Sequence, residues 1–122
     1  MWEKDQRNLD IALHLKNRTS AGDRVFVWGS NPELYFLANR SMATKWMDFD
    51  VADDYPPRAA ERLIQAQTAE ILREKPPRYV VDVQQAARLE NFPHFRSLIE
   101  NCYYLEAQIA GARLYRLRVA DP

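Results

Sequence analysis

Apolar residues occur along the chain in short continuous blocks and in longer stripes with helical spacing. Residues 3–18 repeat apolar side chains on one side of a helix, so a helix is predicted there. Residues 25–28, Val-Phe-Val-Trp, form a block of β-branched and aromatic side chains, which favours a strand buried on both faces. Gly29 ends this strand. A helix is expected over residues 32–38, with Pro32 in its first turn because proline needs no amide partner there.

The rest of the chain repeats this order of strand and helix and then closes with a hairpin pattern. The pattern predicts a short strand at residues 43–46, a helix at 57–74, a buried strand at 79–83 and a helix at 93–101. Residues 103–109 and 113–119 alternate apolar and polar side chains on either side of Ala110-Gly111, which is typical of a β-hairpin.

This succession of elements predicts the fold class. Alternating strands and helices favour parallel strands joined by right-handed crossovers, which place helices on both faces of the sheet. We therefore expect a three-layer α/β/α sandwich with a mostly parallel five-stranded sheet and a C-terminal antiparallel hairpin. The favoured strand order is 2-1-3-5-4, and 2-1-3-4-5 is the alternative. A chain of 122 residues has room for one core, so residues 1–122 are expected to form a single domain.

Composition narrows the classes of partner. Lys plus Arg and Asp plus Glu both number 17, so the formal net charge is zero. Nucleic acids and anionic membranes select a surplus of positive charge, and neither is expected as the main partner. The single cysteine, Cys102, excludes an internal disulfide and a cysteine-based zinc site. No apolar run reaches the ~20 residues of a spanning helix, so the chain itself is expected to be soluble.

A candidate ligand site follows from the fold class. Ligands of open α/β sheets bind beyond the carboxyl ends of the strands, where the chain order reverses. Between the first and third strands, this crevice would be lined by Trp28, Ser30, Asn31 and Glu33 on one side and by Asp82, Gln84 and Gln85 on the other. The amides of the helix that starts near Pro32 would favour an anion there.

The same residue types also have a purely structural interpretation. Ser30 and Asn31 are good helix caps, Glu33 can complete a capping box, and Asp82 can cap a loop. Gly29 has no neighbouring glycines, so the phosphate-binding loops of nucleotide-binding proteins are not indicated, and no cofactor is expected.

Other candidate chemistry gives weak signals. The acidic segment 48–54 contains Asp-x-Asp, but it lacks the glycine and glutamate positions of a calcium-binding EF-hand loop, and a solvated loop is the better interpretation. His14 and His94 have no neighbouring metal-ligating partners in the sequence. Ser30 lacks the following glycine of a nucleophile elbow. We therefore predict no metal site and no catalytic residue, and a small autonomous hydrolase is the least favoured class.

Residues 22–40, Gly-Asp-Arg-Val-Phe-Val-Trp-Gly-Ser-Asn-Pro-Glu-Leu-Tyr-Phe-Leu-Ala-Asn-Arg, carry a resemblance to a known family. Together with Ala43-Thr44, residues 76–82, Phe92-Pro93, Gly111 and residues 114–116, this stretch resembles the soluble C-terminal domain of bacterial membrane glycosyltransferases related to the protein O-mannosyltransferases. The resemblance spans about residues 10–118 and rests on structural signatures, not catalytic ones.

The resemblance implies that residues 1–122 are a fragment of a larger membrane enzyme that takes a sugar from a polyprenyl-phosphate donor. The domain would lie on the extracytoplasmic, periplasmic side of the membrane. The catalytic acid of such enzymes lies in a loop between membrane helices and has no counterpart here, so the chain is expected to be a non-catalytic accessory domain. Its partners would be the membrane-embedded part of the parent protein and a polyprenyl-phosphate sugar or an acceptor. The alternative is a free-standing α/β domain that binds an anionic metabolite in the crevice.

Overall fold

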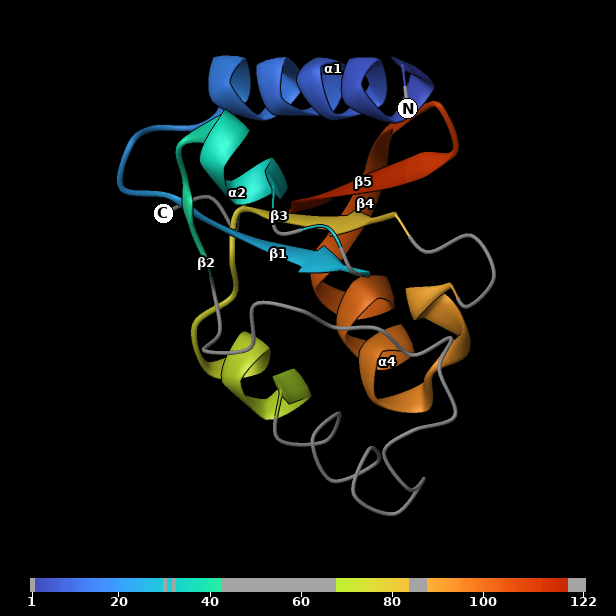
Figure 1. Ribbon diagram of the computed structural model, residues 1–122. Helices are drawn as coiled ribbons and strands as arrows, with labels where there is room; N and C mark the ends of the chain where they lie inside the picture. Colours follow the sequence, from blue (N-terminus) through green and yellow to red (C-terminus); the bar gives the residue numbers. More distant parts are fainter. Residues whose placement is uncertain (1, 30, 32, 43–67, 84–87, 119–122) are drawn as a thin grey trace.

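The computed structural model describes residues 2–29, 31, 33–42, 68–83 and 88–118 (Figure 1). Its elements are, in chain order, α1 (Trp2–Arg18), β1 (Arg24–Trp28), α2 (Glu33–Ala38), β2 (Ser41–Met42), β3 (Tyr79–Asp82), the single 3-10 turn η1 (Leu89–Asn91), α4 (Pro93–Cys102), β4 (Tyr103–Ile109) and β5 (Ala112–Leu117). A further helical segment covers residues 68–74 before β3. Within these ranges, no helix is long and apolar enough to cross a membrane.

The strands form one mixed sheet in the order β2-β1-β3-β5-β4. β1 pairs in parallel with β2 over two residues and with β3 over four. β5 pairs antiparallel with β3 over four residues and with β4 over six. Antiparallel pairing therefore dominates.

This pairing shows that the prediction of a mostly parallel five-stranded sheet is wrong. The prediction counted the second strand equally with the others, whereas the described part of β2 consists of Ser41 and Met42. Apart from that short strand, the sheet has four strands with one parallel and two antiparallel pairs. The strand predicted at residues 43–46 and the first part of the helix predicted at 57–74 lie outside the described residues.

Helices lie on both faces of this sheet, because the buried strands alternate apolar side chains between the two faces (Figure 1). Val25 and Val27 of β1 pack with α1 and α2 on one face. Phe26 and Trp28 of the same strand pack with α4 and the 68–74 segment on the other face. Each large apolar side chain buried in this way contributes about 1.5–3 kcal/mol.

Among the described residues, β2 pairs with β1 only at Arg24 and Val25, and α2 supplies a hydrogen-bond partner for a later residue of β1. The Val27 amide donates a hydrogen bond to the Tyr35 hydroxyl across 2.8 Å. Burial raises the pKa of Tyr35 to about 12, although the Val27 bond acts in the opposite direction, so the hydroxyl stays protonated at neutral pH. Tyr35 thus satisfies a buried backbone amide that would otherwise cost free energy.

The hairpin between β4 and β5 turns tightly at two residues. Ala110 and Gly111 both have positive φ, 48° and 86°, between the paired residues Ile109 and Ala112. Positive φ at both central positions is the geometry of a type I′ turn, whose twist matches that of the flanking strands.

Candidate functional site

The structure brings the carboxyl ends of β1 and β3 together, as a parallel pair requires. Trp28 lies opposite Asp82 in the register, and the Val83 amide donates to the Trp28 carbonyl across 3.0 Å. Asn31 and Glu33 follow β1 on the way into α2. Ser30, Gln84 and Gln85 lie outside the described residues.

Asn31 is bonded to α1. Its side chain is buried, and its Nδ2 donates to Asn8 Oδ1 across 2.9 Å, while Asn8 Nδ2 donates back to Asn31 Oδ1 across 3.3 Å. Asn8 Nδ2 also reaches Glu33 Oε2 at 3.2 Å. The Asn31 and Glu33 side chains therefore both link the start of α2 to α1 through hydrogen bonds with Asn8.

Sequence reasoning missed Asn8, although a signal was present. Asn8 lies four residues before Ala12 and seven before Leu15, both of which are buried on the sheet side of α1. A polar residue on an apolar helix stripe needs a buried partner, and the amide at Asn31 is that partner.

Asp82 and Trp28 also face the interior. Asp82 is fully buried, its Oδ2 accepts a hydrogen bond from the Leu89 amide across 2.9 Å, and its Oδ1 lies 3.8 Å from Arg88 Nη1. Trp28 is equally buried, with its ring centroid 5.1 Å from that of Phe92 and 5.0 Å from that of Phe95. The carboxylate fixes the start of η1, and the indole fills the core.

The crevice residues that the structure describes thus contact other parts of the same chain. Asn31 and Glu33 hold α1, Asp82 holds η1, and Trp28 packs in the core. Each of these side chains has an internal role, but only Asp82 bonds a loop amide as the structural interpretation proposed, whereas Asn31 and Glu33 bond Asn8 of α1. Within the same described ranges, no three His, Cys, Asp or Glu side chains are placed to hold a metal ion.

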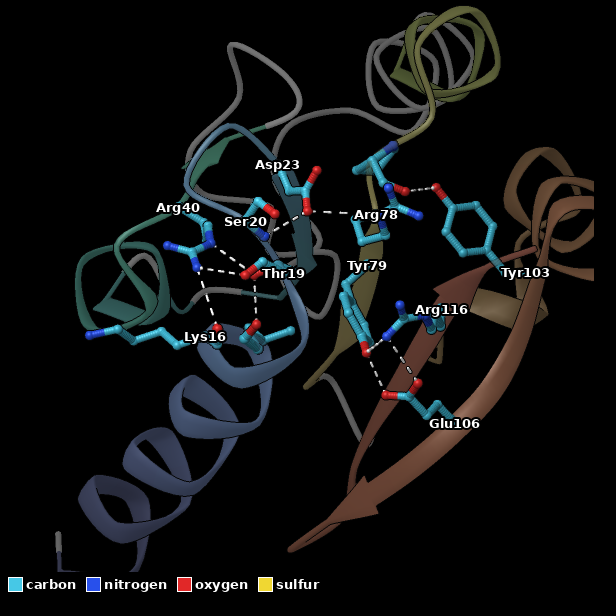
Figure 2. A network of polar contacts seen from close by, with 12 residues as sticks. Lys16, Thr19, Ser20, Asp23, Arg40, Arg78, Tyr79, Tyr103, Glu106 and Arg116 are labelled. Atoms are coloured by element: carbon cyan, nitrogen blue, oxygen red, sulfur yellow. Dashed lines mark hydrogen bonds and ion pairs between the residues drawn. The ribbon is translucent and has the colours of Figure 1, made fainter. Parts of the chain in front are cut away.

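A second polar cluster, which the sequence did not reveal, joins α1 to three strands around Glu106 of β4. Figure 2 shows the contacts among its Tyr79, Glu106 and Arg116 side chains. Tyr79 of β3 donates to Glu106 Oε1 across 2.5 Å, and His14 Nε2 of α1 lies 2.6 Å from the same oxygen. Arg116 of β5 donates to the Tyr79 hydroxyl at 2.8 Å and to Glu106 Oε2 at 3.4 Å. The Arg18 guanidinium lies 3.8 Å from Glu106.

A β-bulge aims Glu106 at this cluster. Leu105 pairs with Tyr115 and Ala107 with Leu114, so Glu106 is the extra residue between two successive pairs. Such a bulge turns a side chain away from the alternation of a regular strand. The regular alternation predicted for residues 103–109 could not show this contact.

The pKa shifts of Glu106 and Tyr79 indicate the protonation states of both groups. Burial raises the pKa of Glu106, but hydrogen bonds from Tyr79 and His14 and the charges of His14 and Arg116 outweigh it, and the pKa is lowered overall. Burial, together with the bond to Glu106, raises the pKa of Tyr79 to about 12 despite the opposing effect of Arg116. At neutral pH the pair is therefore a carboxylate and a phenol. The cluster fastens α1 to the sheet and presents no activated nucleophile among these side chains.

Comparison of the chain with protein-family models, with curated proteins and with solved structures finds no match.

Proposed function

We propose that the chain is a non-catalytic accessory domain of an integral-membrane glycosyltransferase that uses a polyprenyl-phosphate sugar donor. The non-catalytic part of the proposal rests on one observation. The crevice side chains that the structure describes are bonded to other parts of the same chain. Asn31 bonds to Asn8, and Asp82 bonds to the Leu89 amide. A site for substrate needs polar groups directed toward the ligand, whereas these groups position the chain's own elements.

The glycosyltransferase part of the proposal rests on the resemblance. The most characteristic stretch, residues 22–40, includes β1 and α2, and its apolar residues Val25, Phe26, Val27 and Trp28 are all buried. These residues support a scaffold role, because their types are explained by packing. In this proposal, the parent's membrane-embedded part is the partner, the donor or acceptor binds at their junction, and the domain lies on the extracytoplasmic side.

The first experiment reads the open reading frame around the segment that encodes residues 1–122. We expect several upstream segments of ~20 apolar residues each, because a polyprenyl-phosphate enzyme carries its active site among membrane helices. An open reading frame without such segments contradicts the proposal.

The second experiment assays sugar transfer from a polyprenyl-phosphate donor. The intact parent, the parent without this domain and the isolated chain are compared in detergent micelles. We expect no sugar transfer by the isolated chain. The shortened parent should still transfer sugar, because it keeps the membrane active site, but with a higher KM for the acceptor or the donor. Transfer by the isolated chain alone contradicts the non-catalytic assignment.

A third measurement separates this proposal from a free-standing metabolite-binding protein. Inorganic phosphate, nucleotides and sugar phosphates are titrated into the 122-residue chain while amide NMR shifts of Asn31 and Asp82 are followed. We expect both amides to keep their shifts, because their side chains have internal partners. Saturable shifts at both amides favour the metabolite-binding class.

A further inference from the structure

The charges of the described residues are distributed unevenly, although the formal net charge of the chain is zero. The end of α1 and the starts of β1 and β3 lie together at one end of the sheet (Figure 1). We call this region the cationic end. In the described part of the chain, its basic residues are Lys16, Arg18, Arg24, Arg40, Lys75, Arg78, Arg116 and Arg118, and its acidic residues are Asp23, Glu74 and Glu106.

Hydrogen bonds join several of these cations into one surface. The Arg40 guanidinium donates to the Lys16 carbonyl near the end of α1 across 3.5 Å (Figure 2). The Arg24 guanidinium donates to the Lys75 carbonyl across 3.3 Å, and the Arg78 amide donates to the Arg24 carbonyl across 3.0 Å. An arginine keeps its charge when it donates to a carbonyl. These bonds therefore position the cations without neutralising them.

The acidic side chains at this end balance only part of the charge. Asp23 Oδ2 lies 3.8 Å from Arg78 Nε, and Glu106 Oε2 lies 3.4 Å from Arg116 Nη1. Glu74 is the one exposed acid of the cationic end. Within the described ranges, the exposed basic residues of this end that enter no ion pair are Lys16, Lys75 and Arg118. A surplus of positive charge therefore faces solvent.

The opposite end of the sheet has charges that are paired with each other. Asp82 Oδ1 lies 3.8 Å from Arg88 Nη1, and Arg113 Nη1 is paired with Glu90 Oε1. The positive potential is therefore concentrated at the cationic end. Such an uneven field orients a protein against a surface of opposite charge.

An exposed aromatic ring lies beside these cations. Tyr104 is 41% exposed, and Arg118 Cζ lies 6.0 Å from its ring centroid. Tyr104 also lies opposite Arg116 in the register of β4 and β5. Tyrosine and arginine together suit the headgroup layer of a bilayer, where the ring enters the interface and the cations meet phosphates. They also suit nucleic acid, but the position proposed for this domain beside a membrane favours the bilayer.

We propose that the cationic end docks the domain on the phosphate headgroups of an anionic bilayer. This inference rests on the proposed function, which places the domain next to a membrane. The contact is secondary to the one with the membrane-embedded part of the parent, because the chain as a whole has no surplus of positive charge. Each lysine or arginine close to an anionic surface strengthens binding about fivefold.

Co-sedimentation of the 122-residue chain with vesicles tests the proposal. Vesicles of phosphatidylcholine are compared with vesicles that also contain about 30% phosphatidylglycerol, at ionic strengths of about 0.05 M and about 0.5 M. We expect binding only to the anionic vesicles and only at the lower ionic strength. Absence of that binding overturns the inference, as does equal binding to both kinds of vesicle. Neither result bears on the proposed function, which fails separately if the open reading frame encodes no membrane helices.

Two double variants with the same change in net charge test which surface binds. The first combines Lys16→Gln with Lys75→Gln and removes two exposed cations from the cationic end. The second combines Asn91→Asp with Gln108→Glu, at exposed positions on η1 and on the part of β4 that pairs with Arg113. We expect the first to weaken vesicle binding by about tenfold to thirtyfold and the second by less than about threefold. Equal weakening, with circular dichroism confirming that both variants are folded, overturns the inference.

Competition experiments identify the anionic partner. Glycerol phosphate, which carries a single headgroup phosphate, and a duplex DNA oligonucleotide are each added to the vesicle-bound chain at a phosphate concentration equal to that of the lipid. We expect the chain to stay bound in both cases, because only a bilayer combines many phosphates with an interface that accepts the Tyr104 ring. Release by glycerol phosphate assigns the cationic end to a free phosphate, and release by DNA assigns it to nucleic acid. Either result overturns docking on a bilayer.

Discussion

At the scale of single residues, the lowered pKa of Glu106 predicts that the stability of this protein depends on pH. Its folded pKa is lowered, so its contribution to stability is complete above the unfolded pKa of about 4.3 and is lost as the pH falls through the lower folded value. We expect Glu106→Gln to reduce the free energy of unfolding by about 1–2 kcal/mol at pH 7. The difference from wild type should shrink as the pH falls through the lowered folded pKa of Glu106, because the wild-type carboxyl then becomes protonated.

Urea unfolding of both proteins across this pH range measures the effect. Glu100→Gln makes the same chemical change at an exposed position of α4 and serves as the reference. A deficit of Glu106→Gln that is the same at both ends of the pH range would show that the carboxylate charge is unimportant.

The candidate site shows what single-residue reasoning can and cannot supply. Residue type directed attention to the carboxyl ends of β1 and β3, because polar groups that follow buried strands need partners. Residue type alone could not show whether these polar groups bond a ligand or another residue of the same chain. Asn8 lies 23 residues before Asn31, and His14 lies 92 residues before Glu106, so only the fold brings these pairs together.

At the scale of elements, the junction of β1 and α2 depends on one hydroxyl. Tyr35→Phe removes the acceptor of the buried Val27 amide and keeps the ring packing. We expect a loss of about 1–3 kcal/mol in the free energy of unfolding, because the amide is left buried without a partner. Tyr104→Phe, at a 41% exposed tyrosine, should change stability by less than about 0.5 kcal/mol.

Thermal and urea unfolding of these two variants compare the hydroxyls directly. Equal losses for Tyr35→Phe and Tyr104→Phe would mean that the Val27 bond contributes nothing specific.

The hairpin turn stores strain at a residue that is not glycine. Ala110 has φ 48°, a conformation that costs an ordinary L-residue about 1–2 kcal/mol and that asparagine adopts more readily. We expect Ala110→Asn, which creates the Asn-Gly pair preferred in type I′ turns, to stabilise the protein by about 0.5–1 kcal/mol.

Substitution of the neighbouring Gly111 is expected to have the opposite effect on stability. Gly111→Ala puts a side chain at φ 86° and should destabilise the protein by about 1 kcal/mol or more. Urea unfolding of both variants measures the pair, and a destabilising Ala110→Asn would contradict the assigned turn geometry.

Element boundaries were predictable where periodicity is local. The helix α1, the strands β1 and β3 and the hairpin strands begin and end within two residues of the ranges that the pattern indicated. The proportion of parallel and antiparallel pairing was not predictable, because the described part of β2 has two residues and the bulge at Glu106 leaves no mark in the alternation of β4. Both features are decided by packing between distant elements.

At the scale of the whole molecule, the two faces of the sheet share the same strands. Residues 25 and 27 face α1 and α2, and residues 26 and 28 face α4. A strand cannot keep its hydrogen bonds if one face loses its cover, so the two cores should unfold together. We therefore expect a single cooperative transition, seen alike by far-UV circular dichroism and tryptophan fluorescence.

Substitutions in each core test this coupling. Leu15→Ala empties part of the α1 face and Leu98→Ala part of the α4 face, and both side chains are almost fully buried. Each should lower the free energy of unfolding by about 2–5 kcal/mol. The double variant should show the sum within about 0.5 kcal/mol, because the two sites lie on opposite faces and share no direct contact. If either single variant separates the two probes into distinct transitions, the faces fold independently and the shared-strand argument fails.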